Sequence, residues 1–317
     1  MRVGSLGVGC VERAVRTTDG VQLAVRDWWS GGQVDHTVVL LHGFCLSQSC
    51  WDVQIAQLVR RRGARIRVIS YDHRGHGLSD SAPMCTYRVK RLGADLAELL
   101  AVLEVAGPLT IAGHSMGGMA ALAYCGRAAH DRPVDPEALV LVATAARNLD
   151  QRGLGRLLST PQLGALAQLV ALMRPARLDA TARALAGPMS AALMKCGGHR
   201  SAERNTLADL MSAALQTTPL TTAVGFLPGL KNYDLYHSLG SITAATTVVS
   251  GGADVITPAA HARELAASIP HAVHVEVPWG GHMLLHEAPH IVTNAINRAI
   301  RLRPNESATA ARARRAS

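Results

Sequence analysis

The stretch LTIAGHSMGGMAALAYC, residues 109–125, decides the fold. It opens on LTIA, an apolar run typical of a buried strand, and from Met116 onward it has the small apolar residues of a helix. Gly113, His114, Ser115, Met116 and Gly117 lie between these two elements and match the pattern G-x-S-x-G. In a sharp strand-to-helix turn this pattern exposes the serine hydroxyl at the edge of a sheet. The stretch therefore predicts a nucleophile elbow with Ser115 as the nucleophile.

The elements around this stretch alternate along the chain. Short β-branched runs predict strands over 21–29, 37–43, 65–72, 109–115, 138–144, 246–252 and 271–278. Segments with helical character lie between them, at 50–62, 87–105, 116–128, 259–268 and 288–302. This alternation predicts an α/β fold with a mainly parallel, doubly wound sheet that is covered by helices on both faces.

One interval departs from the alternation. Residues 146–235 contain no convincing strand, and their Leu, Met and Ala residues recur at helical spacing between Pro and Gly breaks. We predict a helical cap or lid inserted between a first core segment, 11–145, and a second one, 236–303. The apolar stripes of the cap are expected to pack on the core, and a role facing substrate or lipid is the weaker alternative. Residues 304–317 are polar and basic and are expected to form a disordered tail.

Composition and charge narrow the class of protein. The 317 residues are 48% hydrophobic and 17% charged, which is typical of a compact globular chain. Of the net charge of +9, residues 298–317 carry +5, so no specific nucleic-acid binding is expected and association of the Arg-rich end with a polyanion or membrane surface is a minor alternative. No apolar run reaches the length of a transmembrane segment, and the N-terminus does not resemble a signal peptide, so we expect a cytoplasmic protein.

Neither a metal site nor a disulfide framework is indicated. The six cysteines form no CxxC pair and have no matching histidine spacing, so free thiols are expected. His73 and His76 could suggest ligands, but a structural turn that includes Asp72 and Arg74 is the preferred interpretation. No cofactor is expected.

Five stretches in the same order resemble the α/β-hydrolase family, in its serine esterase and lipase-like branch. They are LLHGFCLSQSCWD, VISYDHRGHGLSD, IAGHSMGG, VVSGGADVITP and VPWGGHMLLHEAP. The resemblance runs from about Thr17 to Ile300 and is weakest in the insertion. It implies the fold that the alternation of elements predicts.

Position by position, the resemblance implies a catalytic triad of Ser115, Asp254 and His282. The residues support this independently, because each follows a predicted strand and the carboxyl ends of parallel strands meet at one edge of the sheet. Their order along the chain is the order expected for this fold. Asp150 and Asp234, which lie near the two ends of the insertion, are weaker alternatives for the acid.

The resemblance also implies an oxyanion hole formed by the backbone N–H groups of Phe44 and Met116. His42 and Gly43 are expected to support this loop, and His42 is expected to orient it rather than to transfer protons. His286 and Glu287 lie near His282 in the sequence, and we expect them to be solvent-exposed or supporting rather than catalytic.

The expected activity is hydrolysis of carboxylic esters through an acyl-enzyme. The substrate is expected to be a small lipophilic ester, with a medium or hydrophobic acyl group, because the predicted cap is rich in Leu, Met and Ala. The same triad could serve a cofactor-free perhydrolase of the haloperoxidase type, or a hydrolase of C–C bonds, amides or lactones. A binding protein without turnover is disfavoured, because no triad residue is missing. The oligomeric state stays open.

Overall fold

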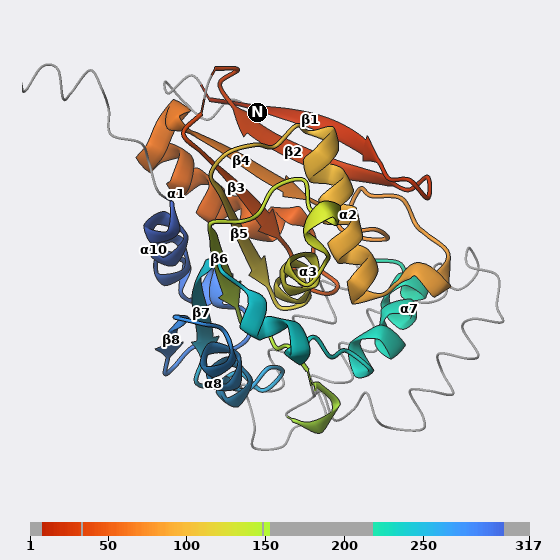
Figure 1. Cartoon of the computed structure of the whole chain (residues 1–317), viewed down its shortest axis with the longest axis vertical. Coiled ribbons are helices and arrows are strands. Elements are labelled where there is room, and N and C mark those ends of the chain that lie inside the picture. The colour runs from red at the N-terminus through yellow and green to blue at the C-terminus, as the bar shows by residue number, and fades with distance from the viewer. Residues whose placement is uncertain (1–7, 33, 148, 153–217, 301–317) are drawn as a thin grey trace, which may run out of the picture.

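The computed structural model describes residues 8–32, 34–147, 149–152 and 218–300. Its described part contains one sheet of eight strands in the order β1-β2-β4-β3-β5-β6-β7-β8 (Figure 1). The strands are β1 Gly9–Arg16, β2 Gln22–Trp29, β3 His36–Leu41, β4 Ile66–Tyr71, β5 Leu109–His114, β6 Ala138–Val142, β7 Ala245–Gly251 and β8 Val273–Val277.

The strands from β4 to β8 in this order are parallel, and β1 and β2 are antiparallel additions at one edge. Leu41 at the end of β3 pairs with Tyr71 of β4 on one side and with Gly113 of β5 on the other. The carboxyl ends of the parallel strands therefore lie at one common edge. Ser115, Asp254 and His282 all follow strands that end there.

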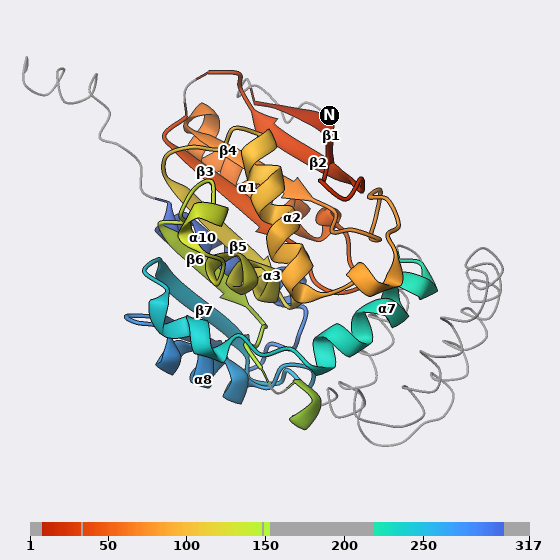
Figure 2. The same cartoon turned by 45° about the vertical axis from the view of Figure 1, so that its right-hand side comes forward.

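Helices cover both faces of the sheet (Figures 1 and 2). They are α1 Asp52–Arg62, α2 Val89–Val102, α3 Met116–Cys125, α7 Leu220–Lys231, α8 Ala259–Ser268, the short α9 Leu284–Glu287 and α10 Pro289–Ala299. Helices α2, α3 and α8 share one apolar core with the sheet, and α1 and α10 share a second core on the opposite face. The predicted doubly wound α/β fold is confirmed.

The central strands are buried because their aliphatic residues face helices on both sides. In β3 every residue is buried, and Val39 and Leu41 belong to one core while Val38 and Leu40 belong to the other. Continuous apolar runs are typical of such doubly covered parallel strands. This burial explains why the central strands appear in the sequence as short β-branched apolar runs.

Strand β1 was not predicted from the sequence. Most of its side chains are exposed, and Val15 is its only fully buried residue. It lies at the sheet edge and pairs with β2 alone, so it carries charged residues such as Glu12 and Arg13 in place of an apolar run. Arg13 forms an ion pair with buried Asp27 at 3.2 Å.

Most of the predicted cap, 153–217, lies outside the described residues, as does the predicted disordered tail, 304–317. The described end of the insertion contains α7, which lies beside the start of α2 (Figures 1 and 2). Phe226 of α7 is fully buried, with its ring centroid 5.0 Å from that of Tyr87 and 6.3 Å from that of Phe44. This helix thus packs against the loop that contains Phe44.

Candidate active site

Ser115 lies in the turn between β5 and α3 and has an unusual backbone conformation. Its φ of 52° falls in the left-handed region, which costs a residue other than glycine about 1–3 kcal/mol. Neighbouring strand β6 holds the turn, because the Ser115 N–H donates to the carbonyl of Val142 at 2.9 Å. The Ser115 carbonyl accepts from the Thr144 hydroxyl at 2.7 Å and from the Gly118 N–H at 2.9 Å. The strained turn is therefore anchored on both sides of the serine.

The two glycines of the motif are required by close backbone contacts. A Cβ atom on Gly113 would lie 2.5 Å from the backbone of Gly117, and one on Gly117 would lie 2.2 Å from the carbonyl oxygen of Leu41. Both distances are shorter than real Cβ contacts allow. The spacing of G-x-S-x-G is thus a steric consequence of packing β3, β5 and α3 together.

His282 connects the serine to a carboxylate. It lies in the loop between β8 and α9, with its Nε2 3.1 Å from the Ser115 Oγ and its Nδ1 2.8 Å from Asp254 Oδ2. Because an ionised carboxylate only accepts, Nδ1 carries the proton and the Nε2 lone pair faces the serine hydroxyl. The structure therefore brings the three predicted residues into one buried, hydrogen-bonded chain.

Asp254 is buried, but both oxygens of its carboxylate accept hydrogen bonds from the protein. Oδ1 accepts from the N–H groups of Ile256 and Thr257, at 2.8 and 2.9 Å. Oδ2 accepts from the Thr257 hydroxyl at 2.7 Å as well as from His282. Burial raises the pKa of Asp254, but attraction to His282 and these hydrogen bonds outweigh it and leave the pKa below its ordinary value. The group that faces His282 is thus a stable carboxylate.

The alternatives for the acid differ from Asp254 in their contacts. Asp234 accepts a hydrogen bond from the Tyr236 N–H at 2.8 Å, and its backbone forms an isolated bridge with Arg147. The side chain of Asp150 lies outside the described residues. Among the three, Asp254 is the carboxylate whose hydrogen bond to His282 the structure describes.

The two predicted oxyanion-hole donors lie in turns at this same edge. Phe44 follows β3, and Met116 is the first residue of α3. Within the described part of the chain, neither backbone N–H donates to a protein acceptor. The first N–H groups of a helix have no intrahelical partner, so Met116 can bind an external oxygen.

Three buried histidines hold the loop that contains Phe44. The Nδ1–H of His42 donates to the carbonyl of Gly43 at 2.7 Å, and its Nε2 accepts from the His73 N–H at 2.9 Å. Likewise, the Nε2 of His76 accepts from the Cys45 N–H at 3.2 Å. Burial lowers the pKa of His42 to about 4 and that of His76 to about 3, so these rings are neutral near pH 7. These contacts hold the loop in place and leave the predicted supporting role of His42 a prediction.

The turn after β4 is also held by charged residues. Buried Arg74 forms ion pairs with Asp95 at 2.6 Å and with Asp19 at 2.9 Å. The carboxylate of Asp72 accepts from the N–H groups of Gln48 at 2.7 Å and Leu78 at 2.9 Å. Within the described residues, no group of three or more His, Cys, Asp or Glu side chains is arranged to hold a metal ion.

Glu287 supports the loop that contains His282. Its carboxylate accepts from the N–H of Gly281 and, at 3.3 Å, from that of Met283, the two neighbours of His282 in the sequence. From the sequence, His286 and Glu287 were expected to be solvent-exposed or supporting rather than catalytic, and Thr257 and Thr144 were not singled out. A threonine three residues after Asp254 is a signal that could have identified the first of these, since short Asp-x-x-Thr turns join the two side chains.

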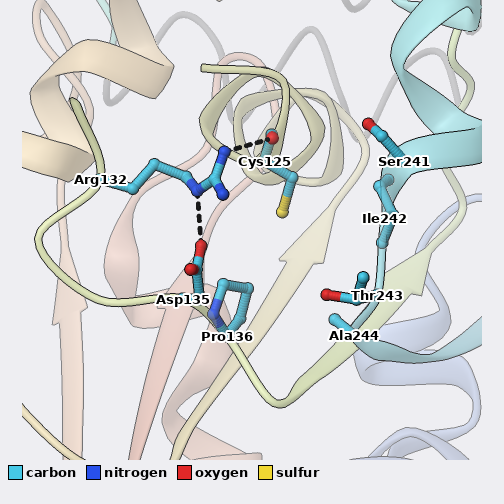
Figure 3. Close-up of a pocket in the computed structure, with 8 residues that line it drawn as sticks. All are labelled: Cys125, Arg132, Asp135, Pro136, Ser241, Ile242, Thr243 and Ala244. Atoms are coloured by element: carbon cyan, nitrogen blue, oxygen red, sulfur yellow. Dashed lines mark hydrogen bonds and ion pairs between the residues drawn. The ribbon is translucent and has the colours of Figure 1, made fainter. Parts of the chain in front are cut away.

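A small pocket lies at the opposite edge of the sheet (Figure 3). Its lining comes from the turn before β6 and the turn before β7, together with the end of α3, and comprises Cys125, Arg132, Asp135, Pro136, Ser241, Ile242, Thr243 and Ala244. No residue of the Ser115–His282–Asp254 chain lines it. The predicted site and this pocket are therefore separate.

Comparison with known proteins identifies the family of the chain. Residues 38–295 match the model of the alpha/beta hydrolase family. The chain belongs to the alpha/beta hydrolase family. The match covers all the parallel strands after the first two residues of β3, and it confirms the resemblance found in the sequence. Membership of this family supports a hydrolytic activity.

Several relatives of this alpha/beta hydrolase are known by name. "Putative carbamate hydrolase RutD" from Klebsiella pneumoniae (strain 342) is 29% identical over 80% of the chain and 86% of its own length. A non-heme chloroperoxidase from Streptomyces lividans is 37% identical, but the match spans 36% of the chain and only 39% of that relative. The structure of a hydrolase from Pseudomonas aeruginosa PA01 superposes with a TM-score of 0.66 at 27% identity, over 91% of this chain and 97% of that one.

None of the helices in the described ranges of this alpha/beta hydrolase is both long enough and apolar enough to cross a membrane.

Proposed function

We propose that the chain is a serine hydrolase that cleaves carboxylic esters through an acyl-enzyme. The observation that carries the proposal is the hydrogen-bonded chain from Ser115 through His282 to Asp254 at the carboxyl edge of the sheet. A serine hydroxyl is a weak nucleophile near neutral pH, and an adjacent imidazole is the base that activates it. Membership of the alpha/beta hydrolase family supports the same chemistry.

In the proposed mechanism each residue of the triad has its own step. His282 Nε2 removes the Ser115 proton as Oγ attacks the ester carbonyl, and it then protonates the leaving alcohol as the tetrahedral intermediate collapses. Asp254 holds the imidazole in the Nδ1–H tautomer and stabilises the imidazolium that forms. Water then attacks the acyl-enzyme by the same route, and the products are the carboxylic acid and free Ser115.

The backbone N–H groups of Phe44 and Met116 would bind the oxygen that becomes negatively charged. Loss of such a donor costs about 10²–10³ in rate. Neither metal nor cofactor is required for these steps. A preference for medium or hydrophobic acyl groups is supported by the Leu, Met and Ala content of the predicted cap, 146–235.

Two other reactions of the same triad have support among the relatives. Similarity to the putative carbamate hydrolase RutD supports attack on a carbamate. Similarity to the non-heme chloroperoxidase supports a reaction in which peroxide replaces water on the acyl-enzyme. Both begin with Ser115 and His282 and differ in the acyl donor or in the second nucleophile. Ester hydrolysis is preferred because it needs only these residues and water. C–C bond, lactone and amide hydrolysis use the same residues as well.

The decisive experiment combines ester turnover with covalent labelling. We expect the wild type to hydrolyse p-nitrophenyl esters and to react with a fluorophosphonate probe. Ser115→Ala should lose labelling and about 10⁴-fold or more in kcat, whereas the exposed Ser81→Ala should keep both. Retained turnover in Ser115→Ala would show that another nucleophile acts.

A series of p-nitrophenyl esters from acetate to laurate tests the acyl preference. An apolar pocket predicts that kcat/KM rises with chain length to a maximum at medium length, since each buried CH₂ contributes about 0.8 kcal/mol. Equal values for all lengths would contradict the pocket, and faster turnover of carbamates than of esters would favour the second reaction.

A further inference from the structure

His114, the residue between Gly113 and Ser115, makes a contact that the proposed mechanism does not use. Its side chain is fully buried, and its Nε2 lies 2.9 Å from the backbone carbonyl oxygen of His282. The two imidazole rings are close, with centroids 5.0 Å apart and planes tilted by 55°. One side chain of the elbow thus touches the loop that carries the proposed base, 168 positions away in the sequence.

The partner of His114 determines its tautomer. A carbonyl oxygen only accepts, so Nε2 carries the hydrogen and donates it to His282. Burial is the main cause that lowers the pKa of His114, to about 3, and proximity to His282 lowers it further. The ring is therefore neutral, and the contact is a fixed hydrogen bond between neutral groups near pH 7.

The other nitrogen of His114 faces the loop of Gly43 and Phe44, which contains a proposed oxyanion-hole donor and is called the oxyanion loop below. Nδ1 is buried, and among the residues that the structure describes it has no hydrogen-bond partner. A Cβ atom on Gly43 would lie 2.7 Å from this nitrogen, so the loop approaches the ring closely where it has no side chain. The ring therefore lies between the oxyanion loop and the loop that contains His282, here called the base loop, and it contacts both.

An orphaned buried acceptor is unfavourable and calls for an explanation. An apolar side chain of similar length would fill the position without it, but it could not donate to the carbonyl of His282. A histidine at this position therefore leaves Nδ1 unpaired but makes the hydrogen bond that places the imidazole of His282 over the Ser115 hydroxyl.

We propose that His114 is a positioning residue that fixes the height of His282 above Ser115 by donating to the backbone carbonyl of His282. His114 does not touch the reacting atoms and exchanges no proton. The inference rests on the proposed function of Ser115 and His282, and it adds a residue that the family resemblance did not assign.

A matched pair of substitutions tests the hydrogen bond. His114→Gln keeps an N–H donor the same number of bonds from Cα as Nε2, and His114→Met places a methyl group there. We expect His114→Met to lower kcat about tenfold at unchanged KM, because one well-placed neutral hydrogen bond is lost. We expect His114→Gln to recover the rate to within about threefold of the wild type.

Stability separates positioning from simple packing. Methionine removes the orphaned Nδ1 but also leaves the His282 carbonyl without its donor, and the two changes offset each other, so His114→Met should leave the melting temperature nearly unchanged while it lowers kcat. The control is His36→Met, since His36 is buried at the opposite edge of the sheet and hydrogen-bonds Thr110 at 2.8 Å; it should keep the wild-type kcat. Should His114→Met not fold, His114→Asn, whose donor is one bond too short, takes its place with the same expected loss.

Fluorophosphonate labelling rates keep this test distinct from the choice of substrate, because labelling requires Ser115 and His282 but no ester. Labelling about threefold to tenfold slower in His114→Met than in His114→Gln supports the positioning role even if no ester is turned over, in which case the ester proposal alone fails. Equal rates in the two variants, or a fall in rate matched by a fall in melting temperature, overturns the positioning role. Absence of labelling in the wild type overturns both proposals.

Discussion

Thr257 makes three contacts around the proposed triad. Its hydroxyl donates to Asp254 Oδ2 at 2.7 Å, its N–H donates to Oδ1 at 2.9 Å, and the hydroxyl also lies 3.3 Å from His282 Nδ1. These contacts help to keep a buried carboxylate ionised. The role of Asp254 therefore depends on a neighbour that no triad motif names.

Replacing Thr257 by valine should weaken the carboxylate without leaving a cavity. Thr257→Val keeps the shape and the backbone N–H but removes the hydroxyl, so we expect kcat to fall about threefold to tenfold and the pKa of Asp254 to rise. Thr257→Ser keeps the hydroxyl and should retain most of the rate. Ester kinetics on the two variants measure the difference.

The unfolding free energy of Thr257→Val gives a second reading. Because the folded-state pKa of Asp254 is depressed, its contribution to stability is present above the unfolded pKa, near 4, and is lost as pH falls through the folded value. The variant should therefore lose about 1–3 kcal/mol at pH 7 and less at low pH. Equal stability at pH 7 would show that the hydroxyl does not stabilise the charge.

At the scale of elements, the elbow is the point where β3, β5 and α3 come closest together. Gly117 lies in the first turn of α3, directly against the carbonyl of Leu41 at the end of β3. The helix begins at Met116, so any displacement of α3 also moves the Ser115 hydroxyl and the Met116 N–H. The stability of the turn and its chemistry are coupled.

Gly117→Ala should therefore reduce both stability and reactivity. Its Cβ would lie 2.2 Å from a backbone oxygen, and relieving such an overlap costs about 1–3 kcal/mol or more. We expect a lower melting temperature and slower labelling of Ser115 by a fluorophosphonate. Gly240→Ala is the matched control, because nothing lies within 4 Å of its Cβ position, and its melting temperature should be unchanged.

At the scale of the whole molecule, four histidines around the proposed active site are buried and neutral. Burial is the main cause that lowers the pKa of each of them below its ordinary value; they are His42, His73, His76 and His114. Above pH 6.5 these residues are neutral in both the folded and the unfolded chain and do not change stability. Below it, the unfolded chain binds protons that the folded chain excludes.

The free energy of unfolding should therefore fall steeply as the pH drops from 7 to about 4. Each such histidine adds a slope of about 1.4 kcal/mol per pH unit once its unfolded form is protonated. Urea unfolding at pH 7, 6 and 5 measures this slope, and the proton uptake on unfolding should exceed one at pH 5. A free energy that does not change between pH 7 and pH 5 would contradict buried neutral histidines.

Much of the fold was predictable because its signals are local. The buried strands are continuous β-branched runs, and G-x-S-x-G marks a turn whose glycines are required within the turn itself and against β3. Strand β1 was missed because an exposed edge strand needs no apolar run, and its place in the sheet is set by its pairing with β2. The predicted cap over 153–217 stays a prediction.

The sequence by itself determined the order of the parallel strands and the main helices between them, the elbow around Ser115, and the residues at strand ends that were expected to meet. The tertiary structure alone decided which atoms touch. Ser115 and His282 lie 167 positions apart, so their 3.1 Å contact depends on how the sheet brings distant loops to one edge. The contacts of His114 and of Thr257 with the loop of His282 have the same origin, because hydrogen bonds between distant segments follow from packing and leave no periodic trace in the sequence, whereas the Thr257–Asp254 contact is local.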